Sequence, residues 1–382
     1  MLVPCDLEAA LTGGDPRTRS VPAGSEPGST QASTGTEVPT EPVSASSDPE
    51  IAELRDELRA AGLLRRRPLY AWVRITATFL LVAAGWVAFV LVGNSWWQLL
   101  TAVYLAVMFT QVGFVGHDVG HRQVSGSRAL NDLLGMLHAN LLIGVSYSYW
   151  VDKHNQHHAH PNQVGRDPDV AVGAIAWTPE QASTGRWPRR MLARSQGALF
   201  FPMTFLEAAN LHYASAHTLR RRSCRHRLLE QGLLGAHVVG YLAAVLLVLS
   251  PARAAAFVVV QQGLFGFYLG CSFAPNHKGM PILAADCDEG FVRRQVLTAR
   301  NLTGGWLTGL AVGGLNYQIE HHLFPAMARS NLRHAQPFVR AFCERHHLAY
   351  TECSPLASYL QTVRHLHQVA RSGQVAPVGR LG

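Results

Sequence analysis

Residues 72–92 read WVRITATFLLVAAGWVAFVLV, in which Arg74 is the one charged residue. A bilayer core about 30 Å thick is crossed by roughly 20 apolar residues in a helix, and this run has that length. Three further segments are similar, at approximately residues 99–115, 232–249 and 254–273. Of the 382 residues, 48% are hydrophobic and 15% are charged, a low charge content for a soluble protein. The sequence therefore predicts an all-α integral membrane protein with four transmembrane helices.

The links between these segments predict two helical hairpins. Residues 93–98 join the first pair and carry adjacent tryptophans, Trp96 and Trp97, which suit the aromatic belt of a membrane interface. Residues 250–253 join the second pair. Basic residues concentrate before the first segment, between the second and third, and after the fourth, so the positive-inside rule places both termini in the cytoplasm. The polar stretches on that side are expected to form a helical cytoplasmic cap.

The rest of the chain divides by composition. Residues 1–46 are rich in Ser, Thr, Gly, Pro and Glu, and we expect a disordered tail there. Residues 47–67 predict an amphipathic helix on the cytoplasmic membrane face, with packing on the protein's own soluble part as the alternative. Residues 68–350 form the expected membrane domain, and residues 351–382 a C-terminal cytoplasmic tail. Two short apolar segments are expected to be buried or interfacial rather than spanning: residues 130–146 and 304–315.

Cysteine spacing and net charge exclude other classes of protein. The net charge of +8 would suit nucleic acid, but Arg65–Arg67 and Arg220–Arg222 lie just before the first and third apolar segments. There they suit anionic lipid headgroups, so we expect membrane lipid and no nucleic acid as a partner. The six cysteines show no paired spacing and are expected to be free thiols in a reducing compartment: Cys5, Cys224, Cys271, Cys287, Cys343 and Cys353.

Histidines cluster near the ends of the apolar segments. Residues 154–158 read HNQHH, and a helix brings positions i, i+3 and i+4 onto one face. Residues 117–121 contain two histidines four apart, and residues 318–322 read QIEHH, which repeats the i, i+3, i+4 layout. Eight imidazoles are therefore expected to converge at one membrane mouth: His117, His121, His154, His157, His158, His277, His321 and His322.

Eight nitrogen donors suit two metal ions better than one. Zinc usually takes four ligands, often with sulfur, and no cysteine accompanies these histidines. Imidazole serves iron and copper as well, and neutral ligands favour a strongly oxidising centre once oxygen is bound. The pattern predicts oxygen activation but does not separate iron from copper. Carboxylates beside the clusters are expected to accept the outer ring N–H groups, with surface charge or helix capping as the alternative: Asp118, Asp152, Asp167, Asp169 and Glu320.

Three stretches resemble a known family. Residues 117–121 (HDVGH), 154–158 (HNQHH) and 318–325 (QIEHHLFP) resemble the three histidine boxes of membrane fatty-acid desaturases. Gln318, in place of a histidine, is similar to the front-end (delta-6 type) acyl-lipid branch, as is the Pro-Asn-His run at 275–277. The resemblance implies a non-haem di-iron enzyme that uses oxygen to desaturate a fatty-acyl chain in the membrane.

The resemblance, which covers roughly residues 70–350, also implies the ligands and partners. The eight histidines would hold two iron ions, and Gln318 and Asn276 would bind directly or through water. Eukaryotic front-end enzymes often carry a fused haem domain with a His-Pro-Gly-Gly motif, and none occurs in this sequence. Electrons would therefore come from a separate protein, expected to be ferredoxin with its reductase, and the enzyme is expected in the cell membrane of a bacterium. Two basic stretches would dock that donor or contact lipid headgroups: Arg186–Arg194 and Arg220–Arg227.

Two other functions stay open on the residues alone. A hydroxylase or related oxygenase would use the same metal centre and return oxygen to the carbon. A metal transporter would need ionisable residues inside the spans, and the predicted spans contain no acidic residue. An acyl chain would instead need an apolar tunnel beside the histidines, for which seven aromatic residues are candidates, with core packing as the alternative: Trp150, Trp177, Phe205, Phe265, Tyr268, Trp306 and Tyr317.

Overall fold

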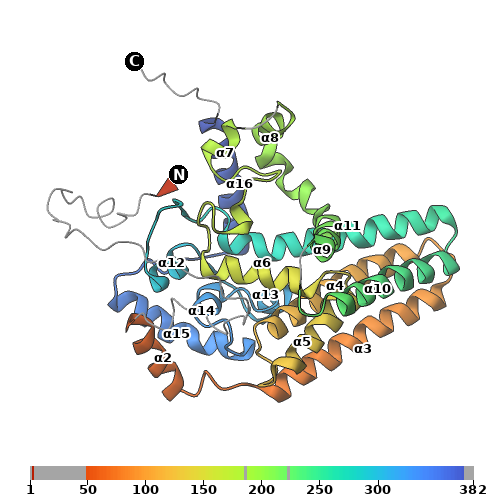
Figure 1. Ribbon diagram of the computed structural model, residues 1–382, viewed down its shortest axis with the longest axis horizontal. Coiled ribbons are helices and arrows are strands. Elements are labelled where there is room, and N and C mark those ends of the chain that lie inside the picture. Colours follow the sequence, from red (N-terminus) through yellow and green to blue (C-terminus); the bar gives the residue numbers. More distant parts are fainter. Residues whose placement is uncertain (1, 4–48, 185–186, 222–223, 374–382) are drawn as a thin grey trace.

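The computed structural model describes residues 2–3, 49–184, 187–221 and 224–373. Within these ranges four helices are long and apolar enough to cross a membrane, which confirms the four predicted spans and identifies a membrane protein. In Figure 1 they lie side by side, and most of the remaining elements gather at one end of them. The four helices are α3 (Pro68–Val92), α4 (Gln98–Gly120), α10 (Arg227–Val248) and α11 (Pro251–His277).

Short links join α3 to α4 and α10 to α11 at the end of the bundle away from the other elements. The backbone N–H of Ser250 donates to Oδ1 of Asn94 at 3.0 Å, which ties the two links together. The bundle core is aromatic, and the rings of Phe89 and Phe257 meet edge to face at 4.9 Å between centroids. Its outer surface carries large apolar side chains that water would not favour, such as Leu247 at 86% exposure. That surface suits contact with lipid.

The other elements form what we call the cap. Its helices are α2 (Pro49–Ala60), α5 (Arg128–Met136), the π-helix η2 (Leu137–Leu142), α6 (Tyr147–Ala159), the 3-10 helix η3 (Pro168–Val170), α7 (Pro179–Ser183), α8 (Trp187–Thr204), α9 (Glu207–Arg221), α12 (Phe291–Leu297), α13 (Trp306–Ala311), α14 (Gln318–Leu323), α15 (Arg329–Arg345) and α16 (Pro355–Ser372). Strand β1 (Leu2–Val3) pairs in parallel with β2 (Ile282–Leu283), and β3 (Asn301–Leu302) pairs in parallel with β4 (Glu352–Cys353). Apart from these two-residue strands, the regular structure described is helical, as predicted.

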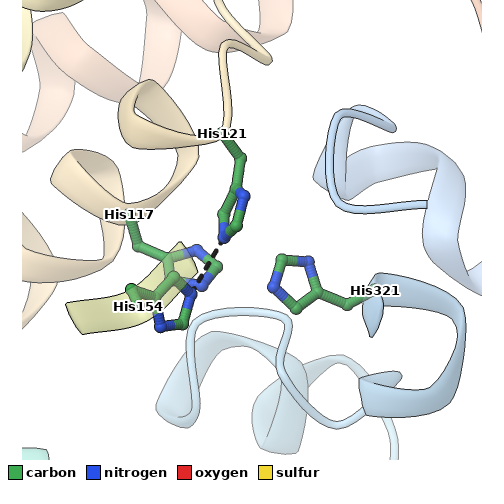
Figure 2. A group of neighbouring side chains, drawn as sticks. All are labelled: His117, His121, His154 and His321. Carbon is green, nitrogen blue, oxygen red and sulfur yellow. Dashed lines mark hydrogen bonds between the residues drawn. The ribbon is translucent and has the colours of Figure 1, made fainter. Parts of the chain in front are cut away.

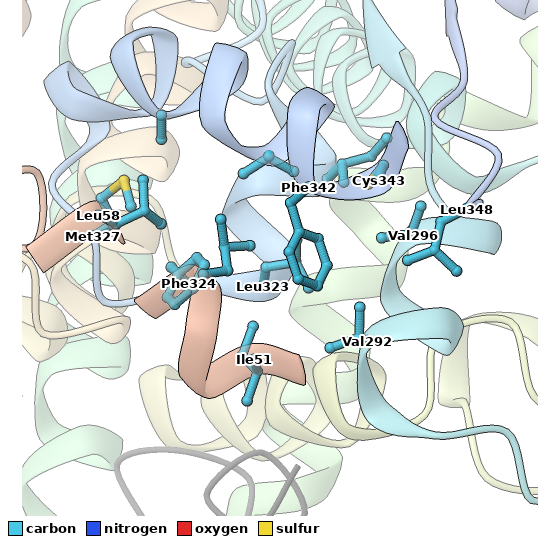
Figure 3. Packing of buried hydrophobic residues seen from close by; sticks show 14 of the residues in the cluster. Ile51, Leu58, Val292, Val296, Leu323, Phe324, Met327, Phe342, Cys343 and Leu348 are labelled. Carbon is cyan, nitrogen blue, oxygen red and sulfur yellow. The ribbon is translucent and has the colours of Figure 1, made fainter. Parts of the chain in front are cut away.

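Helix α2 packs on the protein itself. Its apolar stripe, Ile51, Leu54 and Leu58, is at most 1% exposed. The stripe lies in a cluster with residues from α12, α14 and α15, among them Val292 and Phe342 (Figure 3). Burying each of these aliphatic side chains contributes about 1.5–3 kcal/mol to folding. The stripe therefore packs against other helices of the cap. This is the alternative that the sequence left open to a position on the membrane face.

The segment predicted as buried at 130–146 forms α5 and η2 and then turns sharply into α6. The two helical pieces meet at 112°, so they form either one broken span or a re-entrant loop. Gly144 makes the turn with φ +71, and a Cβ there would lie 2.6 Å from the ring of His237. Asn140 is fully buried, which agrees with the burial expected for this segment; that the segment does not span the membrane stays a prediction. The segment at 304–315 is expected to be buried or interfacial. Trp306 of α13 is 75% exposed, so this part of the segment is not buried and an interfacial position stays the prediction.

Helix α10 begins at Arg227, five residues before the predicted span, and so includes an acidic residue, Glu230. This corrects the expectation that the spans contain none. Glu230 is fully buried and accepts hydrogen bonds from Asn140 Nδ2 at 3.1 Å and Ser146 Oγ at 2.7 Å. It also accepts the backbone N–H of Ser148 at 3.2 Å, in the first turn of α6. These hydrogen bonds satisfy the buried carboxylate within the protein, and they hold the start of α6 against α10.

Two further expectations change in the second half of the chain. Beyond residue 351 the structure has β4 and then α16, whose Leu366 is fully buried, so residues 351–373 belong to the packed cap. Cys287 is disulfide-bonded, whereas Cys224, Cys271, Cys343 and Cys353 are free thiols. The expectation of six free thiols is therefore wrong for Cys287, because the spacing of cysteines along the chain does not show which of them the fold brings together. Cys5 and most of the tail at 1–46 lie outside the described residues.

Candidate metal centre

The eight predicted histidines come together where the cap meets α4 and α11. His117 lies in the last turn of α4, and His277 is the last residue of α11. Helix α6 presents three histidines and α14 two, because positions i, i+3 and i+4 share one helical face. All of them except His121 and His154 are at most 5% exposed. The structure thus places all eight in one buried volume, as the sequence predicted.

The ring nitrogens form two groups, and within each group they lie within 4.8 Å of one another. The first histidine group is His117, His121, His154 and His321, whose rings face one another in Figure 2. The second histidine group is His157, His277 and His322. His158 lies between the groups: its ring stacks on His322 at 4.2 Å between centroids and lies 4.9 Å from the ring of His321. The donors therefore divide into two sets that share one boundary residue.

The nitrogen atoms themselves indicate metal ligands. Nε2 of His117, His321 and His322 is buried without a hydrogen-bond partner in the described chain, an arrangement that costs free energy unless something binds there. Elsewhere two Nε2 atoms face each other directly, at 2.9 Å between His121 and His154. Inward-facing imidazole nitrogens of this kind fit metal ions, and the absence of sulfur and of inward carboxylates in both groups suits iron or copper more than structural zinc.

Burial also sets the protonation state of the imidazoles. It lowers the pKa well below the usual value of histidine because a charged ring loses its solvation in the protein interior. These rings are therefore neutral at neutral pH, which is the form that binds metal ions. This lowering of the pKa holds for five histidines outside the four membrane-spanning helices: His121, His154, His158, His321 and His322.

Asp167 orients His157. Nδ1 of His157 donates to Oδ2 of Asp167 at 3.0 Å, so Nε2 faces the second histidine group. Asp167 is 1% exposed, and it also accepts the backbone N–H groups of Asn162 at 2.7 Å and Asp169 at 2.8 Å. Burial lowers the pKa of His157, but the neighbouring charge of Asp167 outweighs it and the pKa is raised overall. A carboxylate in this position fixes the ring and strengthens it as a ligand.

The other four candidate carboxylates are engaged elsewhere or exposed. Asp118 accepts from Arg329 Nη2 at 2.6 Å and lies 3.6 Å from Nδ1 of His117. Glu320 is fully buried and accepts from Asn301 and Tyr350, and burial raises its pKa to about 7. None of its hydrogen bonds in the described chain goes to a histidine. The remaining two lie near α6: Asp152 is exposed, and Asp169 pairs with Lys153 at 2.8 Å.

Two groups that the sequence did not indicate hold the second histidine group. Oε1 of Gln295, a fully buried residue of α12, accepts from Nδ1 of His322 at 2.8 Å. The backbone carbonyl of Thr298 accepts from Nδ1 of His277 at 3.0 Å. Both come from a segment without histidines. Gln318, predicted as an outer ligand, lies 2.9 Å from Nε2 of His277, and it accepts a hydrogen bond from Asn276 at 3.2 Å.

A cavity of about 610 Å³ opens onto these histidines. Its wall includes His117 and His154 of the first group and His157 of the second. The rest is mainly apolar, supplied by α4, η2, α6, α8, α9 and α11. Of the seven aromatic residues considered for a tunnel, Trp150 and Trp177 line the cavity. The other five do not line it; Phe265, for example, is packed in the bundle core.

Comparison with known proteins agrees with this site. Residues 94–354 match the model of the fatty acid desaturase family. The acyl-lipid (9-3)-desaturase of Physcomitrium patens is 32% identical over 72% of this chain and 54% of its own length. The Delta(8)-fatty-acid desaturase of Euglena gracilis is 27% identical over 90% of this chain and 84% of its own. The Delta(6)-fatty-acid desaturase of Caenorhabditis elegans is 28% identical over 83% of this chain and 74% of its own length.

These relatives are front-end desaturases, as the glutamine of the third histidine box predicts. The chain spans about half the length of the Physcomitrium patens protein. All three organisms are eukaryotes, so the bacterial origin expected from the sequence stays a prediction. The match covers all three histidine boxes, both histidine groups and the cavity beside them. The chain belongs to the fatty acid desaturase family.

Proposed function

We propose that this chain is an oxygen-dependent desaturase that removes two hydrogens from a fatty-acyl chain, with two iron ions held by the eight histidines. One observation carries the proposal: the apolar cavity reaches both histidine groups. An acyl chain in that cavity would gain about 0.8 kcal/mol for each buried methylene, and some of its methylenes would lie against the imidazoles. Two bound iron ions would supply, with dioxygen, the oxidising power that unactivated methylenes require.

The protein's own contribution is to position the acyl chain. Gly113 and Gly116 face the cavity from α4, so no side chain separates the helix backbone from an acyl chain at these positions. Trp150 stacks on His154 at 4.5 Å between ring centroids and also lines the cavity, which joins the wall to the first histidine group. Because the wall is mainly apolar, it would hold adjacent methylenes in place beside the histidines.

The orientation in the membrane is part of the proposal. We place the cap, the termini and the histidines on the cytoplasmic side, with α3–α4 and α10–α11 as two membrane hairpins. Arg65, Arg66 and Arg67 support this side, because they precede α3 at its cap end. Electrons would reach the site from a separate cytoplasmic protein of the ferredoxin type. Labelling of single cysteines placed in the link at residues 93–97 and at exposed cap positions would test the orientation.

Product analysis tests the reaction itself. Expression in a host with a defined fatty-acid profile, followed by mass spectrometry of the fatty-acid methyl esters, separates a desaturase from a hydroxylase. A desaturase gives a product lighter by two hydrogens, and a hydroxylase gives one heavier by one oxygen. The His157→Ala variant should remain in the membrane and form no product. Retention of full activity in that variant would contradict the ligand assignment, and elemental analysis of the purified protein would distinguish iron from copper.

A further inference from the structure

A second cleft lies on a different face of α4 from the cavity that opens onto the histidines, which we call the acyl cavity. It forms where the start of α3, the end of α4 and the start of α15 meet. We call it the arginine cleft. Its buried floor and its more exposed rim contain six polar residues: Asp118, Gln123 and Arg329 in the floor, and Arg67, Tyr70 and Arg74 at the rim.

The arginine cleft has an excess of positive charge. Three guanidinium groups line it, and Asp118 is the one carboxylate among its lining residues. Asp118 is already bound by Arg329 through Nε at 3.1 Å and Nη2 at 2.6 Å. The other two arginines bond to neutral groups: Arg67 Nε donates to an asparagine oxygen at 3.1 Å, and Arg74 Nη1 donates to Tyr70 at 3.3 Å. Neither Arg67 nor Arg74 hydrogen-bonds to a carboxylate within the described chain, and the charge of Asp118 offsets only one of the three guanidinium charges.

One atom of the floor points to a bound acceptor. Nη1 of Arg329 is buried and makes no hydrogen bond to any described group, although the arginine side chain is only 6% exposed. A buried N–H group of a charged side chain without a partner costs more free energy than a neutral one, so a ligand oxygen beside it would be stabilised. The enclosed part of the cleft is about 20 Å³, which is room for one water-sized group such as a phosphate oxygen.

The surroundings indicate where the ligand comes from. Leu69 and Val73, on the neighbouring face of α3, are 79% and 58% exposed, and Trp72 between them is partly exposed, as is common at the membrane interface. The rim of the arginine cleft therefore lies beside a surface suited to lipid chains. Arginine binds phosphate with two parallel hydrogen bonds, and three arginines around one small cleft suit a single phosphate group.

We propose that the arginine cleft binds the phosphate group of an anionic membrane lipid. The lipid chains would lie along the exposed face of α3, and the phosphate would bridge Arg67 and Arg74 at the rim while one oxygen accepts from Nη1 of Arg329. This site is separate from the acyl cavity, and the proposal does not depend on the reaction that the histidines carry out.

The test uses the full chain in nanodiscs of phosphatidylcholine containing a minority of phosphatidylglycerol. Native mass spectrometry measures how much of each lipid stays bound after release from the disc. The test variant is Arg67→Gln with Arg74→Gln, which leaves the buried Arg329–Asp118 pair intact. The control is Arg364→Gln with Arg371→Gln, two exposed arginines of α16, which lies far from the start of α3 in Figure 1. It changes the net charge by the same amount.

We expect the wild type and the control to retain phosphatidylglycerol in preference to phosphatidylcholine. The test variant should bind phosphatidylglycerol at least about tenfold more weakly, because two charge-assisted contacts are lost. The Arg74→Lys variant, which keeps the charge but cannot form two parallel hydrogen bonds, should bind phosphatidylglycerol more weakly than the wild type and more strongly than the test variant. Equal retention by the test variant and the control would overturn the proposal, as would a wild type without preference between the lipids. Displacement by millimolar inorganic phosphate would show that the phosphate group alone suffices, and its failure to displace would assign the ligand to the whole lipid.

Discussion

Replacing Asp167 by asparagine should remove one metal ion and leave the other. The carboxylate accepts three hydrogen bonds, from Nδ1 of His157 and from the backbone N–H groups of Asn162 and Asp169. Asparagine has the same shape but only one oxygen, and that oxygen is neutral. His157 belongs to the second histidine group, whereas no histidine of the first group forms a hydrogen bond or ion pair with Asp167 in the described chain.

The size of the effect follows from these contacts. If the asparagine oxygen takes the place of Oδ2, it still accepts from His157, but without the charge that makes the ring a stronger donor to a metal. Loss of such an outer partner typically weakens metal binding 10- to 100-fold, or by about 1.4–2.7 kcal/mol. The amide NH₂ then faces the N–H of Asp169, which leaves a buried donor unpaired and lowers folding stability by about 1–3 kcal/mol.

The assay is iron titration of purified protein with metal content measured by mass spectrometry. At limiting free iron, wild type should hold two ions per chain and Asp167→Asn close to one, while Asp152→Asn, an exposed carboxylate on α6, should match wild type. A thermal unfolding curve checks that the variant is folded. If Asp167→Asn bound two ions with wild-type affinity, the role given to Asp167 would be refuted. If it lost both ions while folded, the division into two groups would be refuted.

Four further outcomes are expected. Gly113→Ala should fold normally, because its Cβ would lie 3.6 Å from Leu269, but it narrows the cavity, so fatty-acid analysis should show less product from the longest chains. Glu230→Ala leaves buried donors without an acceptor and should lower the free energy of unfolding by about 3 kcal/mol, and Glu230→Gln by less, as measured by denaturation. Phe342→Ala removes a fully buried ring of the cluster around α2 and should lower the free energy of unfolding by about 3–5 kcal/mol. The control Leu356→Ala, at an exposed position, should change that free energy by no more than about 0.5 kcal/mol. Brief treatment with a chelator should remove one ion of the pair before the other, and loss of both at one rate would contradict the unequal support of the two histidine groups.

The spans and the eight histidines were predictable because both are local patterns. Hydropathy marks the stretch in contact with lipid, and helical spacing of i, i+3 and i+4 marks a shared face. The ends of the helices were less predictable for the same reason. Helix α10 begins at Arg227 and α11 continues to His277, since a helix that enters the cap can carry polar residues that no lipid-facing window would include. Hydropathy therefore located the spans but placed their cap-side ends four or five residues inside the true helix ends.

The carboxylates show where sequence adjacency fails. Glu320 precedes His321 and Asp118 follows His117, but neighbouring residues of a helix point about 100° apart. Adjacency to a ligand therefore does not by itself direct a carboxylate to that ligand's outer nitrogen, and these two side chains bond to Tyr350 and Arg329 instead. The prediction for Asp167 is confirmed because a loop after α6 brings this carboxylate back to the outer nitrogen of His157, Nδ1. Gln295 of α12 and Thr298, which directly follows that helix, carry no local signal, because they reach the histidines through contacts between distant elements.

These outer contacts divide unequally between the two histidine groups. In the second group each ring is held through Nδ1, by Asp167, by Gln295 or by the carbonyl of Thr298. In the first group no ring of the described chain donates to a carboxylate or carbonyl within hydrogen-bond distance, and His117 lies 3.6 Å from Asp118. A ligand set whose rings are fixed before binding loses less entropy when the ion arrives. The second group should therefore bind its ion more tightly, and the first group, which also meets the stacked Trp150 at the cavity wall, keeps more freedom to adjust when an acyl chain enters.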